Sequence, residues 1–430
     1  MSAELISILV LVVVFVIATT RSINMGALAF AAAFGVGELV AGLDADGIFA
    51  GFPGDLFVVL VGVTYLFAIA RANGTTDWLV HASIRLVRGR TALIPWVMFA
   101  LTGALTAIGA VSPAAVAIVA PIALSFAARY GISPLLMGAL VVHGAQAGGF
   151  SPISIYGSIV NGVVERENLP GNALVLFLAS LVVNLIIAAI VFVLFGGLKL
   201  TGRDLGTEER EKGEDTTGPE SGAGPLTADS ARLNAARTAT LTALAALVVA
   251  VLVLDLDAGL TAITLAVVLS AFWPDTSRKA VGEVAWPTVL LICGVLTYVG
   301  VLEEMGTIEY AGNAVGDIGV PLLAAVLLCY IAAVISAFAS SVGIMGALIP
   351  LAVPFLAQGE IGAVGMIAAL AVSATVVDVS PFSTNGALVL AAAPDVDRER
   401  FFRQLMVYGG IVVAVVPAAV WLVMVVPGFG

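Results

Sequence analysis

Apolar stretches of roughly 18 or more residues recur along this 430-residue chain, and each is long enough to cross a lipid bilayer as a helix. Hydrocarbon offers no hydrogen-bond partners, so such a chain must satisfy its backbone within helices. The chain is 60% hydrophobic and only 11% charged, whereas soluble domains carry about 25% charged residues. These features predict an all-α, multi-pass protein of the plasma (inner) membrane, with the lipid bilayer as its surroundings.

The same composition excludes other functional classes. Lys and Arg total 18 and are scattered, so we expect no nucleic-acid partner. Cys293 and Cys329 lie in apolar runs and are expected to be buried small hydrophobes. The first apolar run, from Leu5, has no basic residue before it, so we interpret it as a retained helix rather than a signal peptide.

The apolar stretches form two similar series, each with five full spans and one interrupted segment. The interrupted segments, 92–129 and 320–357, could each form two short spans or one re-entrant hairpin, and we adopt the hairpin. The ten full spans are predicted at 4–20, 24–42, 54–71, 133–166, 172–198, 236–254, 258–274, 285–303, 361–394 and 404–427.

The two series also match in sequence. The segment SPISIYG at Ser151 matches SPFSTNG at Ser380, an offset of 229, and the same offset aligns Ser112 with Ser341. Because each series has an odd number of spans, the second must enter the membrane from the opposite side. Inverted repeats of this kind are typical of secondary transporters, whose substrate site lies near the midplane where the repeats meet. We therefore divide the chain into a first repeat at 1–198, a flexible linker at 199–236 and a second repeat at 237–430.

The basic residues predict the orientation. If the N-terminus is external, 17 of the 18 basic residues face the cytoplasm and only Arg166 lies outside. This orientation places the linker and the first hairpin on the cytoplasmic side, and the second hairpin and the C-terminus on the outer side. The linker is rich in Glu, Gly, Thr and Pro, which is typical of a flexible tether.

Two full spans are interrupted by Ser-Pro pairs, in SPISIYG and SPFSTNG. Proline lacks an N–H group and disfavours helix at the preceding residue, so both spans are predicted to break into half-helices. The N-terminus of a half-helix suits an anion, whereas free carbonyl and hydroxyl oxygens suit a hard cation such as Na⁺. Both broken spans and both hairpin tips therefore predict ligand sites.

Asp378 is the only carboxylate deep inside a predicted span. A charge at that depth costs at least ~2.5–3.5 kcal/mol on insertion scales, so it indicates a functional site. Asp378 could bind a cation or carry a proton. His143 and Gln146 are the other polar side chains at this depth, and a lone His is interpreted as a hydrogen-bonded packing residue.

An enzyme would need a nucleophile and base, or a metal set, at one depth. The chain has two histidines and no paired carboxylates, so we predict that it is not an enzyme, has no catalytic residues and needs no cofactor beyond a coupling ion such as Na⁺.

With its two interrupted segments, two broken spans and inverted repeat, the chain resembles the divalent anion/sodium symporters of the ion transporter superfamily. It resembles the MatC-type dicarboxylate carrier permeases more closely. The segments GGFSPIS and VDVSPFSTNG carry most of this resemblance. Where that family has Ser-Asn-Thr at each hairpin tip, this chain has Val111-Ser112-Pro113 and Ser340-Ser341-Val342. The resemblance implies a homodimer and an elevator mechanism, in which hairpins and broken helices move against a scaffold of the other spans.

The sequence thus predicts a secondary active transporter that carries a small dicarboxylate, such as malonate, succinate or malate, and is coupled to Na⁺ or H⁺. The alternative is a cation/proton antiporter centred on Asp378. We assign substrate binding to Ser112, Pro113, Ser151, Ser154, Ser341, Ser383, Thr384 and Asn385. We assign the coupling cation to Asp378, Ser380, Ser336, Ser340 and Gly149.

Overall fold

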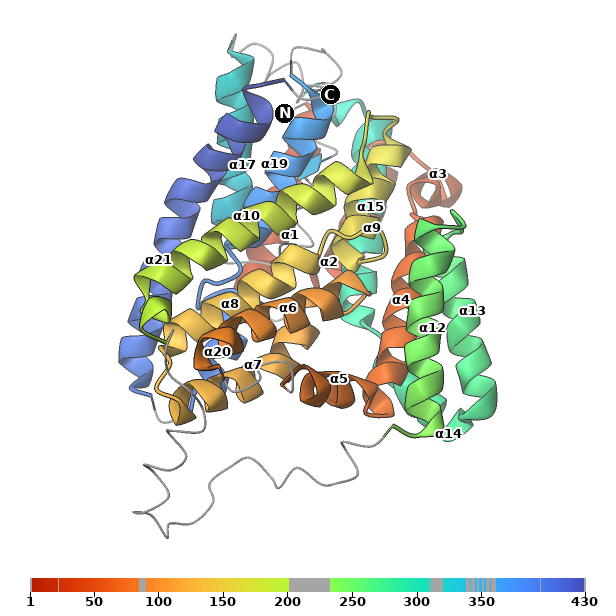
Figure 1. The fold of residues 1–430 in the computed structure, drawn as a ribbon. Coiled ribbons are helices and arrows are strands. Elements are labelled where there is room, and N and C mark those ends of the chain that lie inside the picture. Colours follow the sequence, from red (N-terminus) through yellow and green to blue (C-terminus); the bar gives the residue numbers. More distant parts are fainter. Residues whose placement is uncertain are drawn as a thin grey trace, which may run out of the picture.

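The described part of the chain consists of helices and their connections, as the apolar pattern predicts (Figure 1). Six of these helices are long and apolar enough to cross a membrane, and six shorter apolar helices accompany them in the same part of the chain. The computed structural model describes residues 2–428 except for 22, 85–89, 201–232, 309, 311–319, 338–340, 342–344, 346–347, 350–351, 353–355, 357–360 and 395.

The helices of the first half are α1 (Ala3–Thr20), α2 (Met25–Leu39), α3 (Ala45–Ala50), α4 (Gly54–Ala72), α5 (Thr75–Ile84), η2 (Thr91–Leu93), α6 (Ile94–Ala107), α7 (Ser112–Arg129), α8 (Pro134–Gly148), α9 (Ile155–Arg166), α10 (Ala173–Leu194) and η3 (Gly197–Leu200). Those of the second half are α12 (Ala235–Leu252), α13 (Ala258–Phe272), α14 (Pro274–Gly282), α15 (Trp286–Glu304), α17 (Pro321–Ser336), α19 (Ala363–Val376), α20 (Thr384–Ala392), α21 (Arg398–Val420) and η4 (Trp421–Val425).

Each predicted span contains a helix near the expected bounds, and the two spans with Ser-Pro pairs contain two helices each. The first interrupted segment forms α6 and α7, which pack against each other. The second begins with α17, but much of 338–360 lies outside the described residues, as do residues 201–232 of the predicted linker. The short helices α3 and α14 were not predicted; α3 packs on α15, and α14 packs on α4.

Glycines allow two pairs of helices to approach closely. Helix α2 packs on α15, where a Cβ at Gly294 would lie 2.0 Å from the Gly26 carbonyl oxygen. Helix α4 packs on α13, where a Cβ at Gly62 would lie 2.5 Å from the Gly259 carbonyl oxygen. Small residues at such contacts are typical of helix association in membranes. The two contacts are equivalent, since α2 and α4 hold the places in the first half that α13 and α15 hold in the second.

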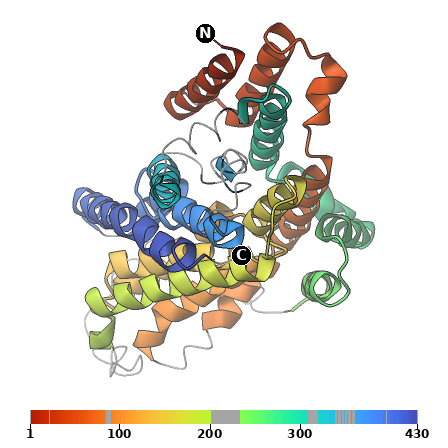
Figure 2. The same ribbon diagram turned by 90° about the horizontal axis from the view of Figure 1, so that it is seen from above.

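The helices form two groups. Figure 2 shows α1, α2 and α15 on one side of the molecule and α10, with α6 and α8, on the opposite side. Both labelled termini lie at the same end in Figure 1, and α5 and α14 lie at the other end.

Large apolar side chains are exposed on the outer helices, including Phe34 on α2, Ile186 on α10 and Val407 on α21. Apolar surface this extensive is expected where helices face lipid.

Candidate functional site

Both predicted helix breaks are present in the structure. Helix α8 ends at Gly148 and α9 begins at Ile155, while α19 ends at Val376 and α20 begins at Thr384. The intervening loops are buried almost throughout. Non-helical backbone is tolerated at membrane depth where protein covers it or where it lines a cavity. Both breaks therefore place free backbone groups inside the protein.

The two loops have the same hydrogen-bond pattern. The Ser154 hydroxyl lies 2.5 Å from the Gly149 carbonyl oxygen and 2.7 Å from that of Ser151, and it accepts a bond from the Gly157 N–H at 3.2 Å. The Ser383 hydroxyl lies 2.5 Å from the carbonyl oxygen of Asp378 and 2.7 Å from that of Ser380. It also caps α20 by accepting from the Gly386 N–H at 3.3 Å. Ser154 and Ser383 thus shape the loops in which they lie.

The offset of 229 that relates the loops also reveals where they differ. It pairs Asp378 with Gly149 and Asn385 with Tyr156, so only one loop carries a carboxylate. Gly149 is buried, and a Cβ added there would lie 3.0 Å from the Tyr156 ring. The two loops therefore share a hydrogen-bond pattern but differ in charge.

Asp378 is buried and accepts two hydrogen bonds. Ser341 donates its hydroxyl to Oδ1 at 2.6 Å, and the Gln146 amide donates to Oδ2 at 2.9 Å. Ser336, at the end of α17, in turn donates to the Ser341 hydroxyl at 2.8 Å. Neither direct donor carries a charge, so the carboxylate remains without neutralisation by these contacts. A bound cation or a proton would provide it.

Ser112, at the tip between α6 and α7, belongs to the same network. Its hydroxyl oxygen lies 2.8 Å from the Asn385 amide nitrogen and 3.4 Å from that of Gln146. Gln146 therefore links Ser112 to Asp378, and through Asp378 to Ser341. We call these five residues, together with Ser336, the central polar cluster: Ser112, Gln146, Ser336, Ser341, Asp378 and Asn385.

The other predicted residues lie outside this cluster's hydrogen bonds. The Ser151 hydroxyl donates to the Ala107 carbonyl oxygen at the end of α6, and the Ser380 hydroxyl accepts from the Phe382 N–H at 3.3 Å. Thr384 is exposed, Pro113 is half-buried, and Ser340 lies outside the described residues.

Gln146 is the member of the cluster that the sequence did not assign to a ligand. Its Oε1 atom and the Oδ1 atom of Asn385 are buried without a hydrogen-bond partner. Buried polar atoms without partners are uncommon in proteins and call for an explanation such as an ion. Amide, hydroxyl and carboxylate oxygens are ligands that hard cations prefer. In the described residues no three His, Cys, Asp or Glu side chains could hold a metal ion together, so a cation here would depend on these mixed oxygens.

His143 lies in a buried network that connects to the central polar cluster through the Gln146 carbonyl oxygen. Its Nδ1 atom is 2.8 Å from Asn184 Oδ1 and its Nε2 atom is 2.6 Å from the Tyr408 hydroxyl. The Asn184 amide donates to the Ser180 carbonyl oxygen at 2.9 Å. The Ser180 hydroxyl in turn donates to the Gln146 carbonyl oxygen at 2.9 Å. Both ring nitrogens are engaged, which agrees with the interpretation of His143 as a packing residue.

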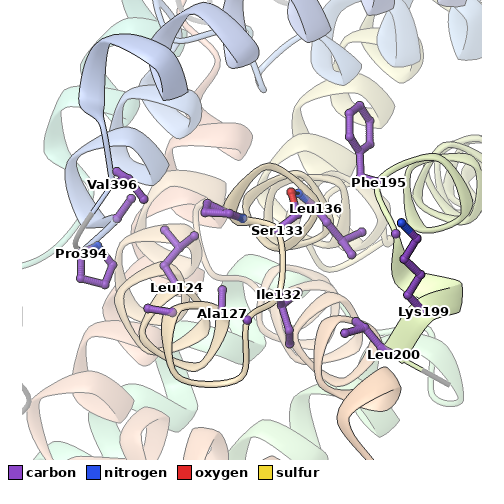
Figure 3. A pocket seen from close by; sticks show the side chains of 15 residues that line it. Leu124, Ala127, Ile132, Ser133, Leu136, Phe195, Lys199, Leu200, Pro394 and Val396 are labelled. Atoms are coloured by element: carbon purple, nitrogen blue, oxygen red, sulfur yellow. Dashed lines mark hydrogen bonds between the residues drawn. The ribbon is translucent and has the colours of Figure 1, made fainter. Parts of the chain in front are cut away.

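Two cavities lie among the described helices. The larger, of about 740 Å³, lies at the ends of α7, α8 and α10 and is lined by Ser133, Phe195 and Lys199 among others (Figure 3). Among the described residues that line it, none is a predicted site residue. The smaller, of about 270 Å³, lies between α4, α15 and the tip of the first hairpin, and Pro113 lines it. Of these two cavities, the smaller is lined by a predicted site residue.

Fold and site together define an all-helical membrane protein with a buried polar cluster where two broken helices meet a hairpin tip. Residues 1–149 match the family model of the dicarboxylate carrier protein MatC N-terminus. The resemblance to MatC-type carriers inferred from the sequence is confirmed over these residues, which run from α1 to the break after α8. No curated protein matches the chain.

Proposed function

We propose that this protein is a secondary active transporter that carries a small dicarboxylate across the plasma membrane, coupled to Na⁺ or H⁺. The match of residues 1–149 to the dicarboxylate carrier family supports the transport of a dicarboxylate. The single observation that carries the coupled mechanism is the central polar cluster, in which Asp378 joins the first hairpin tip to Ser341.

The cluster favours a cation as the coupling species. Asp378 supplies a negative charge, and Gln146 and Asn385 each hold an oxygen atom without a hydrogen-bond partner. A Na⁺ ion bound to these oxygens would neutralise the carboxylate and satisfy both amides. The dicarboxylate would bind on the cavity side of Ser112, where the α7 N-terminus begins and its dipole favours negative charge.

The arrangement of helices suits an elevator mechanism. The broken helices and hairpins, α6–α10 and α17–α21, would form the moving part, and α1–α4 with α12–α15 would form the scaffold. Helix α4 of this scaffold contacts α9 of the moving part. In this proposal the scaffold also supplies the homodimer contact, and residues 199–236 connect the two inverted repeats on the cytoplasmic side.

The test is uptake by vesicles that contain the purified protein. Labelled malonate, succinate, malate and citrate would be offered separately, each under an imposed Na⁺ gradient or an imposed H⁺ gradient. The proposal expects accumulation of a C3 or C4 dicarboxylate driven by one of the two gradients. Accumulation of none of these anions under either gradient would contradict it.

The second candidate, a cation/proton antiporter, is favoured by Asp378 alone. Such a protein would exchange Na⁺ for H⁺ across the same vesicles with no dicarboxylate present. A pH-sensitive dye inside the vesicles would record that exchange. Proton movement that depends on Na⁺ and ignores added dicarboxylate would support the antiporter over the symporter.

A further inference from the structure

The smaller cavity separates the tip of the first hairpin from the scaffold. Thr64 and Arg71 line it from α4, Thr288 lines it from α15, and Pro113 lines it from the hairpin tip. Pro113 follows Ser112, whose hydroxyl contacts Asn385. A residue that lines the cavity is therefore adjacent in sequence to a member of the central polar cluster.

Two charged residues line this cavity, and they are paired with each other. The Arg71 guanidinium donates to a carboxylate oxygen of Glu283, which precedes α15. The side chains are 38% and 55% exposed, so the pair is open to solvent. The remaining lining is apolar or carries hydroxyl groups, including Thr64 and Thr288. Arg71 is thus the single positive charge in the lining.

Arg71 adds a positive charge to the groups that the sequence offers for binding the anion. No basic residue lies at the depth of Asp378 in the sequence, so helix N-termini, hydroxyls and bound cations are the groups expected to hold the anion there. Arg71 lies in the last turn of α4, yet it shares a cavity with the hairpin tip. Arg71 therefore offers a positive charge beside the hairpin tip.

The geometry points to Arg71 as a binding residue for one carboxylate of the substrate on the cytoplasmic side of the hairpin tip, where the substrate displaces Glu283. This inference rests on the proposed function and names the residue that selects a dianion. Arg can bind a carboxylate through two parallel N–H groups, and in the structure one of its nitrogens, Nη2, donates to Glu283. A cavity of about 270 Å³ suits a C3 or C4 dicarboxylate, since sites for larger, drug-sized ligands occupy roughly 300–1,000 Å³.

Glu283 would then set how readily the substrate leaves. When the anion departs, the carboxylate of Glu283 takes its place on Arg71, so release leaves no unpaired guanidinium. Removal of Glu283 should therefore strengthen substrate binding, whereas removal of Arg71 should weaken it. A purely structural ion pair would respond differently, because the loss of either partner would break the same contact.

The test compares Arg71→Gln and Glu283→Gln in inside-out membrane vesicles, which expose the cytoplasmic face, and in intact cells. For labelled succinate, Arg71→Gln is expected to raise the half-saturating concentration about tenfold in inside-out vesicles and to change it less than twofold in cells. Glu283→Gln is expected to lower it at least threefold in the same vesicles. Monomethyl succinate, offered as an unlabelled competitor, should inhibit uptake by the wild type and by Arg71→Gln at similar concentrations, because it lacks the second carboxylate.

Matched controls come from the exposed pair Arg403 and Glu399, 3.0 Å apart on α21. Arg403→Gln and Glu399→Gln should leave both half-saturating concentrations unchanged, and Arg71→Lys should fall between the wild type and Arg71→Gln. If Arg71→Gln and Glu283→Gln shift the half-saturating concentration in the same direction, or if neither shifts it, the ion pair only stabilises the structure and the inference is wrong. Absence of succinate, malonate and malate transport by the wild type would instead overturn the proposed function itself.

Discussion

Replacement of Asp378 by Asn tests the coupling role of the central polar cluster. The side chain keeps its shape but loses its charge. Two unit charges about 4 Å apart at an effective dielectric constant of about 20 attract each other by about 4 kcal/mol. At about 1.4 kcal/mol per tenfold, this attraction corresponds to a roughly thousandfold loss of affinity for a bound cation. If Asp378 binds Na⁺, Asp378→Asn should therefore raise the Na⁺ concentration for half-maximal uptake by two to three orders of magnitude.

The same substitution separates the two coupling ions. If Asp378 binds Na⁺, the pH dependence of uptake should stay close to that of the wild type; if it carries a proton, the pH dependence should disappear. The Asn amide must also face a donor from Ser341 or Gln146, at a cost of about 1–3 kcal/mol in folding free energy, so thermal unfolding is measured in parallel. Thr375→Val is a control at a similar depth, because the Thr375 hydroxyl bonds to its own helix. Wild-type Na⁺ and pH profiles in folded Asp378→Asn would refute the assignment.

Three further predictions concern the helix break, the outer face and the orientation. Gly386→Ala should lower the free energy of unfolding by about 1–3 kcal/mol in detergent, because its Cβ would lie 1.9 Å from the Ser380 carbonyl oxygen, whereas Gly410→Ala, with open space around it, should not. Burial and the neighbouring Glu303 raise the pKa of Glu167 from 4.5 to about 7, so unfolding releases a proton between these values and stability should fall as pH rises from about 4.5 to about 7. Glu167→Gln should remove that part of the pH dependence, and Glu165→Gln should not; equal pH profiles for wild type and Glu167→Gln would count against this reasoning. Finally, Lys279→Cys should react with an impermeant thiol reagent only from the cytoplasmic side, and Glu304→Cys only from outside. The native Cys293 and Cys329 are buried and should not contribute to the labelling. The reverse pattern would invert the proposed topology.

Local features of the sequence determined the helices and their interruptions. Apolar runs of sufficient length specify helices in lipid because each segment satisfies its own backbone. Pro152 and Pro381 break two of these helices because proline lacks the N–H that the ladder requires, and the flanking Ser154 and Ser383 cap the next helix. These effects act within a few residues, so they could be predicted from the chain alone.

Only the tertiary structure decided which polar groups meet. Ser112 and Asp378 are far apart in sequence, and the link between them depends on Gln146, whose role no local pattern indicates. Arg71 likewise becomes important only because the fold brings it to Glu283 and to the tip of the first hairpin. All three lie far apart in the sequence. The offset of 229 predicted that Ser112 and Ser341 are equivalent, but not that Asp378 and Gln146 connect them. Such contacts arise from the packing of whole helices, where small residues such as Gly26 and Gly294 set how closely the backbones approach, and packing of this kind is not encoded at any one position.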